Sequence, residues 1–408
     1  MRRSITLVAV LGATLALGAC GSTSTPAADT KTTAAKSGGT ITIWVDESRK
    51  PAVAAAAAAF EKDTGSTVEL VTKNFDDIRT DFGAQVPTGK GPDITVGAHD
   101  WLGELTANGL VAPIELGDKV RDFEPVSVEA FTQDKQVYGL PYAVENVALI
   151  RNTALAPTAP ATWQDAITTG QKSGAKYPIL LQMDGIKGDP YTAYALQSSF
   201  GAPVFDQNAD GSYSSELGLG GPSGEAFATF LAAQGKAKVL DPAITYDVAV
   251  AAFAAGQSPY IIGGPWMLEK FGKLKLAIDP IPSAGGKPAQ PFVGVAGFYL
   301  NAKSKNLLTA NDFLVNYMST KDAQLALYKA GNRPPALIAA ADAASADPIT
   351  AGFREVGKDA VPMPSIPEMA KVWSFWGVTE GSIVSGTLKP VDGWQKMVSD
   401  IQGALDAA

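Results

Sequence analysis

A strand, helix and strand at the start of the folded part limit the chain to few architectures. Residues 40–45 alternate β-forming side chains and predict a strand. Residues 51–63 follow as an alanine-rich helix with proline in its first turn, and Gly65 ends it. Residues 66–74 return to strand character. Two strands joined by such a helix lie parallel in one sheet, so the sequence predicts an α/β fold with flanking helices.

The same rhythm continues along the chain. Residues 92–98 predict a short strand that ends beside His99, Asp100 and Trp101, and residues 137–152 predict a longer extended run. Glycine or proline closes each of the predicted helices, which lie at 162–173, 224–234, 246–255, 307–319 and 321–330. Ligands of open α/β sheets bind beyond the carboxyl ends of strands, so residues that follow strands are the first candidates for a site.

Composition excludes several classes of function. The 408 residues are 46% hydrophobic, which is enough for more than one core. The net charge is −8 and no dense basic run follows the first three residues, so we expect no nucleic-acid partner. One cysteine and one histidine cannot form an intramolecular disulfide or a zinc framework, and we expect no metal or cofactor.

The N-terminus predicts export and a lipid anchor. Residues 1–19 join Arg2 and Arg3 to an apolar run at 5–17 that is too short to span a bilayer. Cys20 follows Leu-Gly-Ala, a string that resembles the lipobox of bacterial lipoproteins; a buried thiol or an ordinary signal cleavage are the alternatives. Residues 20–39 are small and polar and predict a flexible tether. Removing residues 1–19 changes the net charge to −10.

Motifs for catalysis are weak or absent. Residues 86–91 look like a phosphate loop but lack its first glycine and its final serine or threonine. Residues 206–216 resemble a calcium loop, yet Glu216 falls one position short, and a polar hairpin turn is favoured. A Ser/His/Asp triad would need His99, which has no nucleophile-elbow partner. Two carboxylates alone can hydrolyse a glycoside, so a glycosidase stays open.

Tryptophans favour a sugar as the ligand. Several of the seven stand beside Gly, Pro or Asp rather than inside periodic helices. Sugars stack their C–H faces on flat rings and donate hydroxyl hydrogen bonds to carboxylates, so aromatic and acidic groups together suit them. For any one tryptophan taken alone, core packing is still favoured.

Strings along most of the mature chain resemble the maltose-binding protein branch of the extracellular solute-binding proteins, the receptors of ATP-binding-cassette (ABC) sugar importers. The strings at 91–94 (GPDI) and 264–266 (GPW) are common to the wider family. Those at 98–100 (AHD) and 143–145 (AVE), and the Pro-x-Ile-Pro-x-Met string at 364–369, point to maltose and maltodextrin receptors. Further resembling segments lie at 41–45, 60–65, 141–152, 188–191, 251–257 and 291–295.

The resemblance implies two α/β lobes of the type II periplasmic-binding-protein fold, joined by hinge strands around a ligand cleft. The expected first lobe is 40–143 plus 295–320, and the second is 144–294 plus 321–408. The chain would cross near Ala143, Gly294 and Thr320. Hinge closure would bury the sugar and present it to the transporter.

Site residues follow from the resemblance one at a time. Asp100 and Glu145 match carboxylates that accept sugar hydroxyls, while Asp189 and Tyr191 match an acid and a tyrosine that contact a second glucosyl unit. The matched stacking tryptophans are Trp266 and Trp373, and the polar group after the first strand comprises Glu47, Ser48 and Arg49. The chain departs from the pattern at Gly97, Trp101, Arg79, Ser374 and Gly377. Trp101 is nevertheless expected among the ligand-binding residues, and Trp376 beside Gly377 is expected to supply stacking.

We therefore expect a monomeric, lipid-anchored receptor on the outer face of the cell membrane. It would capture maltose, maltodextrin or a related oligosaccharide and deliver it to an ABC permease without covalent chemistry. A receptor for a peptide or a metal complex has the same fold and is the first alternative. A surface glycosidase is the second.

Overall fold

The computed structural model of the chain describes residues 38–185, 187–208 and 213–407. The expected signal at residues 1–19, the expected lipidation site Cys20 and residues 20–37 of the expected tether lie outside the described residues. Among the residues that the structure describes, no helix is both long and apolar enough to cross a membrane.

The predicted strand, helix and strand are confirmed at the start of the largest described sheet. Strands β1 (Thr40–Val45) and β2 (Thr67–Thr72) pair in parallel, and α1 (Lys50–Thr64) connects them. Gly65 ends α1 with a φ of 73°, a left-handed conformation that glycine adopts without steric cost. Strand β3 (Ile94–Ala98) pairs in parallel on the other side of β1.

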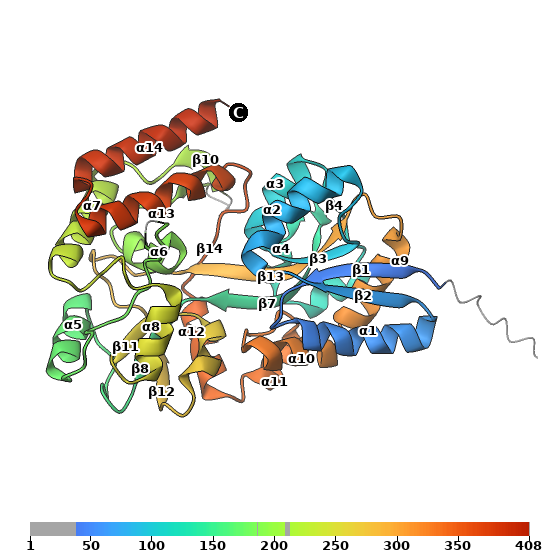
Figure 1. The fold of residues 1–408 in the computed structure, drawn as a ribbon, viewed down its shortest axis with the longest axis horizontal. Coiled ribbons are helices and arrows are strands. Elements are labelled where there is room, and N and C mark those ends of the chain that lie inside the picture. Colours follow the sequence, from blue (N-terminus) through green and yellow to red (C-terminus); the bar gives the residue numbers. More distant parts are fainter. Residues whose placement is uncertain (1–37, 186, 209–212, 408) are drawn as a thin grey trace, which may run out of the picture. The chain divides into compact units, whose positions relative to one another are not determined.

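Strand β13 (Phe292–Asn301) completes this sheet from far along the chain. It runs antiparallel to β3 and to β7 (Gly139–Asn146), and it also pairs with β4 (Val111–Ala112) and β14 (Val361–Pro362). All ten residues of β13 are buried. Figure 1 shows β13 and β7 side by side, extending from the elements around β1 toward those around α6 and α13.

The extended run predicted at 137–152 is two strands in two sheets. It breaks at Val147, after β7, and resumes as β8 (Ala148–Asn152). Strand β8 pairs antiparallel with β11 (Tyr260–Gly263) and β12 (Leu276–Asp279). The smaller described pairs are β5 (Thr132–Gln133) with β6 (Gln136–Val137), and β9 (Phe205–Gln207) with β10 (Tyr213–Leu217).

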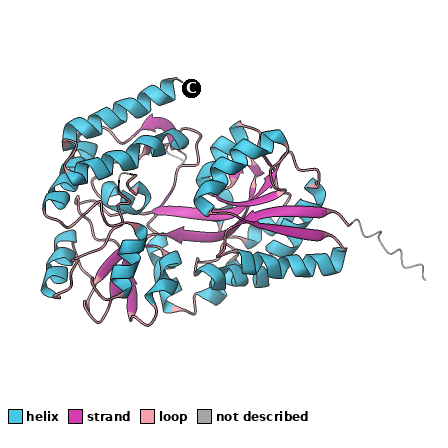
Figure 2. Cartoon of the chain, viewed as in Figure 1, coloured by secondary structure: helices cyan, strands magenta, loops and turns pink. Residues whose placement is uncertain are grey.

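Helices cover both faces of the sheets (Figure 2). The predicted helices are confirmed, although the one at 307–319 ends as a π-helical turn, η5 (Phe313–Met318). Besides α1, and with the predicted helices included, the α-helices of the described chain are α2 (Phe75–Gln85), α3 (Leu102–Ala107), α4 (Pro125–Glu129), α5 (Trp163–Lys172), α6 (Pro190–Ser198), α7 (Gly221–Lys236), α8 (Tyr246–Ala254), α9 (Leu307–Asp312), α10 (Lys321–Gly331), α11 (Ile338–Ala344), α12 (Pro348–Gly357), α13 (Met369–Ser385) and α14 (Pro390–Asp406). Short 3-10 turns are η1 (Val86–Thr88), η2 (His99–Trp101), η3 (Gly117–Asp122) and η4 (Pro265–Phe271).

Buried side chains form three groups. The first core surrounds the large sheet and includes Ile43, Phe60 and Phe298. The second core includes Leu149, Tyr260, Trp376 and Trp394, and the third core includes Ile150, Phe253, Ile261 and Phe353. Strand β8 separates the last two, because its alternate side chains enter opposite faces.

The first core continues past the crossing expected near Thr320. Ala323, Leu327 and Ala340 belong to it, whereas Phe353 belongs to the third core. Helices α10 and α11 therefore pack with the large sheet, and the change of core falls between α11 and α12.

Candidate functional site

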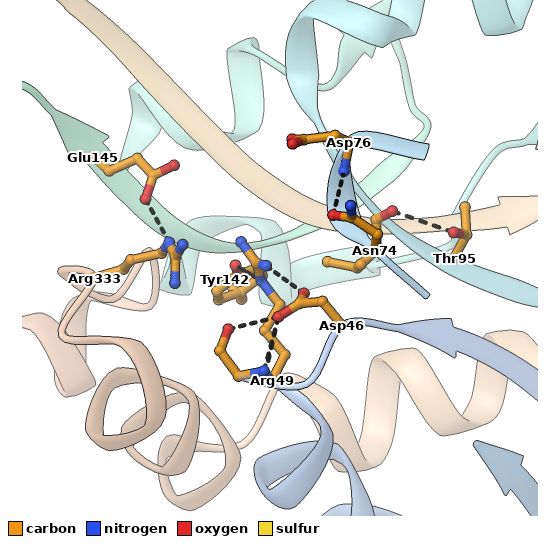
Figure 3. Close-up of polar contacts among 10 residues, drawn as sticks. Asp46, Arg49, Asn74, Asp76, Thr95, Tyr142, Glu145 and Arg333 are labelled. Carbon is orange, nitrogen blue, oxygen red and sulfur yellow. Dashed lines mark hydrogen bonds and ion pairs between the residues drawn. The ribbon is translucent and has the colours of Figure 1, made fainter. Parts of the chain in front are cut away.

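Glu145 lies on β7 directly opposite Gly294 of β13. Its Oε2 is 2.8 Å from Nε of Arg333, and both side chains are less than one-fifth exposed. The two buried atoms attract each other by charge but make no hydrogen bond within the described residues, because the N–H is not directed at the oxygen. Figure 3 shows the pair beside the two strands. A carboxylate has two oxygens that accept and a guanidinium has five N–H groups that donate, so the pair has more hydrogen-bonding groups than this one contact uses.

Arg333 is a site candidate that the sequence analysis missed. Asn332 ends α10 in the left-handed conformation, with a φ of 55°. The next residues run along β7, where Val144 N–H donates to the Pro334 carbonyl at 2.9 Å. The signal in the sequence is an arginine between an asparagine, a residue that often ends helices in the left-handed conformation, and two prolines.

A second charged group follows β1. Arg49 is 4% exposed, forms an ion pair with Asp46 and donates a hydrogen bond from Nε to the hydroxyl of Tyr142 (Figure 3). Its guanidinium lies 4.7 Å from the ring centre of Phe75. Burial opposes ionisation of Asp46, but the charge of Arg49 and nearby hydrogen bonds lower the pKa of Asp46. Protein partners thus engage Nε and Nη1 of Arg49, whereas Glu47 nearby is exposed.

Asp100 and Trp101 follow β3, as expected. Asp100 is 7% exposed, and burial raises the pKa of its carboxyl. Trp101 packs 5.4 Å from the ring centre of Phe75. A side chain on Gly97 would meet the Trp101 ring at 2.7 Å. The two departures from the maltose-receptor pattern are therefore linked, because Gly97 provides the space that Trp101 fills.

Tyr191, on α6, reaches the same point at Gly294 as Glu145. Its hydroxyl is 3.1 Å from the point that a Gly294 Cβ would occupy, and Glu145 Cγ is 3.5 Å from that point. Burial, followed by the negative charges of Glu145, Asp189 and Asp100, raises the pKa of Tyr191 well above its ordinary value. The hydroxyl stays protonated and can donate as well as accept.

Asp189 serves the helix that carries Tyr191. It is the N-cap of α6, and its carboxylate accepts hydrogen bonds from Thr192 N–H at 3.2 Å, from Thr192 Oγ1 at 2.6 Å and from Gln182 Nε2. The bond from the Thr192 N–H satisfies one of the free N–H groups at the start of the helix. Asp189 therefore fixes the position of Tyr191, and its carboxylate already has three donors.

Trp266 borders this group, and Trp373 lies on α13 against Trp376. Trp266 is half-buried, and its ring centre lies 6.3 Å from that of Tyr191. Its ring covers Gly264, where a Cβ would come within 2.1 Å of it. Trp373 on α13 is also half-buried and stacks on Trp376 at 5.5 Å and 28°.

Trp376 itself belongs to the second core. It is fully buried, its Nε1 donates to Gln197 Oε1 at 3.0 Å, and its ring meets Tyr194 edge-on at 6.1 Å. No face of the ring is open to solvent. The structure thus brings Glu145, Tyr191 and Trp266 together with Arg333, while Trp376, Asp189 and Arg49 lie beneath or beside them with protein partners.

Glu380, one turn after Trp376, is a buried acid without a hydrogen-bond partner among the described residues. It is fully buried, and the Trp376 N–H is directed at Gln197 instead. Burial, followed by the negative charge of Asp189, raises the pKa of Glu380 well above 4.5. Folding therefore favours the protonated acid.

The variant Glu380→Gln is expected to gain stability relative to the wild type as pH rises. A carboxyl with a raised pKa in the folded state contributes full stability below its unfolded value of 4.5, and that stability is lost as pH rises through the folded value. Glutamine keeps the neutral shape and cannot ionise. Urea unfolding at pH 5 and pH 8 measures the difference, with the exposed Glu69→Gln as control. An equal difference at both pH values would contradict the prediction.

Metal sites find no support in the described chain, where no three His, Cys, Asp or Glu residues are grouped to hold an ion. Strands β9 and β10 contain the two ends of the calcium-like segment and pair antiparallel, as the favoured hairpin requires. Residues 209–212 at its turn lie outside the described residues.

Comparison with known proteins decides the family. Residues 55–352 match the model of the bacterial extracellular solute-binding proteins. The chain belongs to this family. The resemblance identified in the sequence and the α/β solute-binding-protein fold expected from it are confirmed.

Named relatives of this solute-binding protein bind oligosaccharides. The structure of a Thermus thermophilus maltotriose binding protein bound with maltotriose matches with a TM-score of 0.80 and 33% identity, covering 90% of this chain and 100% of that one. A galactooligosaccharide-binding protein of Bacillus subtilis is 26% identical over 96% of this chain and 95% of its own length. A maltooligosaccharide ABC transporter solute-binding lipoprotein of Streptococcus pneumoniae is 26% identical over 91% and 90%. These relatives are named as binding proteins, not as enzymes.

Proposed function

We propose that this solute-binding protein is a lipid-anchored receptor that captures a maltooligosaccharide such as maltotriose and passes it unchanged to an ABC permease. The observation that carries the proposal is the group at Gly294. There a carboxylate with free hydrogen-bonding capacity, a tyrosine hydroxyl and a half-buried indole meet on the strands that connect the two halves of the fold. The 33% identity with a maltotriose-bound structure favours this ligand.

The chemistry of the group suits a sugar. Glu145 accepts hydroxyl hydrogen bonds, Arg333 donates them, and Tyr191 does both. Trp266 and Trp373 offer ring faces for the C–H surface of the sugar. Asp100 adds an acceptor after β3, as its electrostatic influence on Tyr191 indicates. We place the sugar in a cleft between two lobes. The first lobe is built on the first core, which includes helices up to α11. The second lobe is built on the other two cores, and the chain returns to it at α12.

Anchoring and assembly complete the proposal. Cys20 would carry the lipid, the tether would hold the lobes outside the membrane, and the receptor would act as a monomer on the outer face of the cell. The lipoprotein named among the relatives supports this arrangement.

Calorimetry with maltotriose tests the function. We expect one site per chain, and chromatography of the incubated sugar is expected to recover maltotriose alone. Glucose release would instead favour the glycosidase, and a response only to peptides or metal chelates would favour the receptor for other solutes.

A galactooligosaccharide is the second candidate ligand, because the Bacillus subtilis relative that spans nearly the whole chain is named for it. If the protein bound that sugar more tightly than maltotriose, the galactooligosaccharide would become the first candidate ligand and maltotriose the second.

Replacing Trp266 by alanine is expected to weaken maltotriose binding by more than about 1 kcal/mol, because the stacking face beside Tyr191 is lost. Calorimetry on the variant measures the change. Tyr177→Ala is the matched control, since Tyr177 is also partly buried against the third core and is expected to bind like the wild type. Unchanged affinity in Trp266→Ala would remove Trp266 from the site.

A further inference from the structure

The only histidine of the chain bridges three distant segments. His99 is 1% exposed and lies in η2, directly after β3. Its Nδ1 accepts a hydrogen bond from Val295 N–H on β13 at 3.0 Å, and its Nε2 lies 3.0 Å from the carbonyl oxygen of Met363. A backbone N–H can only donate and a carbonyl can only accept. The ring is therefore neutral, with its proton on Nε2.

The bond to Met363 joins the two halves of the fold. His99 follows a strand of the first core, whereas the Met363 side chain belongs to the second core. A second bond runs beside it, from Gly103 N–H to the Ser365 carbonyl at 3.1 Å. A Cβ on Gly103 would stand 2.5 Å from that oxygen, so the absence of a side chain permits the approach. Residues 363–367, which we name the strap, are thereby fixed against η2 and α3.

The strap leads directly into α13, which carries Trp373. At the other end of the bond, His99 is the neighbour of Asp100. One imidazole thus stands between an acidic candidate from one half of the fold and a stacking candidate from the other.

We propose that His99 is a positioning residue for the sugar site. Its neutral ring holds Asp100, hinge strand β13 and the strap in one arrangement, so that Asp100 and Trp373 face the same ligand. The inference rests on the proposed function, and it gives His99 no contact with the sugar.

The electrostatic surroundings keep the ring neutral. Burial lowers the pKa of His99 below its ordinary 6.5, and it outweighs the nearby carboxylates of Asp100 and Glu145 and the hydrogen bonds from and to the backbone, which act in the opposite direction. The edge of Phe131 covers another side of the ring. A lowered pKa gives stability that is present above 6.5 and is lost as pH falls through the folded value, where a protonated Nδ1 can no longer accept from Val295.

Nitrogen NMR of the full chain tests the tautomer without any sugar. Because the chain has one histidine, a proton–nitrogen correlation spectrum shows a single imidazole. We expect the Nε2–H tautomer, unchanged as pH is lowered through 6.5. A proton on Nδ1, or titration near 6.5, would overturn the inference whatever the protein binds.

Two substitutions then separate the two bonds. In His99→Asn the amide oxygen can replace Nδ1 but nothing reaches Met363, whereas in His99→Gln the amide nitrogen can replace Nε2 and the Val295 N–H is left buried without an acceptor. We expect His99→Asn to bind maltotriose roughly tenfold more weakly. His99→Gln is expected to keep the affinity and to unfold at a lower temperature.

The outcomes distinguish this inference from the proposed function. Folded His99→Asn protein with wild-type affinity would overturn the positioning role, as would a greater loss of affinity in His99→Gln. A wild type that binds no sugar would instead refute the proposed function, and the tautomer measurement would still report whether the ring bridges β13 and the strap.

Discussion

Trp376→Ala is expected to lower the free energy of unfolding by about 3–5 kcal/mol, the usual cost of removing a fully buried tryptophan. The variant leaves a cavity beside Tyr194 and removes the hydrogen-bond donor of Gln197. Urea or guanidinium unfolding followed by circular dichroism measures the loss. The size of the effect identifies Trp376 as part of the second core rather than as a sugar-stacking surface.

Trp373→Ala is the matched control, because Trp373 lies three residues earlier on the same helix and is only half-buried. We expect it to lose less stability than Trp376→Ala and to lose affinity for maltotriose. Equal stability of Trp376→Ala and the wild type, together with weaker sugar binding, would return Trp376 to the binding surface.

Glu145→Gln is expected to weaken maltotriose binding by roughly 1.5–3 kcal/mol, about 10- to 100-fold, because a hydrogen bond to a charged acceptor is lost in a largely buried place. The change also leaves Arg333 without its carboxylate. Calorimetry measures the affinity, and thermal unfolding shows whether the fold persists.

Glu124→Gln provides the control for Glu145→Gln. Glu124 also pairs with an arginine far along the chain, with an Oε1 to Arg354 Nη2 distance of 2.7 Å, and this ion pair involves neither Tyr191 nor Arg333. We expect its affinity for maltotriose to equal that of the wild type. If the two variants bound the sugar equally well, Glu145 would not be a ligand-binding residue.

Local signals explain which parts of the fold the sequence predicts. The first strand, helix and strand follow from side-chain alternation, alanines and Gly65, all within a few residues of the structure that they determine. The break at Val147 is different. Residues on both sides favour strands, and only the burial of Val147 in the second core sends β8 to another sheet.

The candidate site also has residues that the sequence predicts and residues whose role depends on long-range packing. Glu145 and Tyr191 were identified from strings that resemble the family, and the structure places them together at Gly294. Arg333 was missed because its partner Glu145 is remote in sequence and only the course of the chain beside β7 joins them. Trp373 and Trp376 lie three residues apart on α13, so their different burial depends on how α13 packs, which no single-helix pattern reveals.

The place of β13 in the chain has a consequence for biosynthesis. Strands β3 and β7 are synthesised long before residues 292–301, which supply the central partner for both. Until those residues emerge, each early strand has an unpaired edge, and such long-range pairing forms slowly. The large sheet can therefore be completed only late in translation, which would suit the export that the N-terminal sequence predicts.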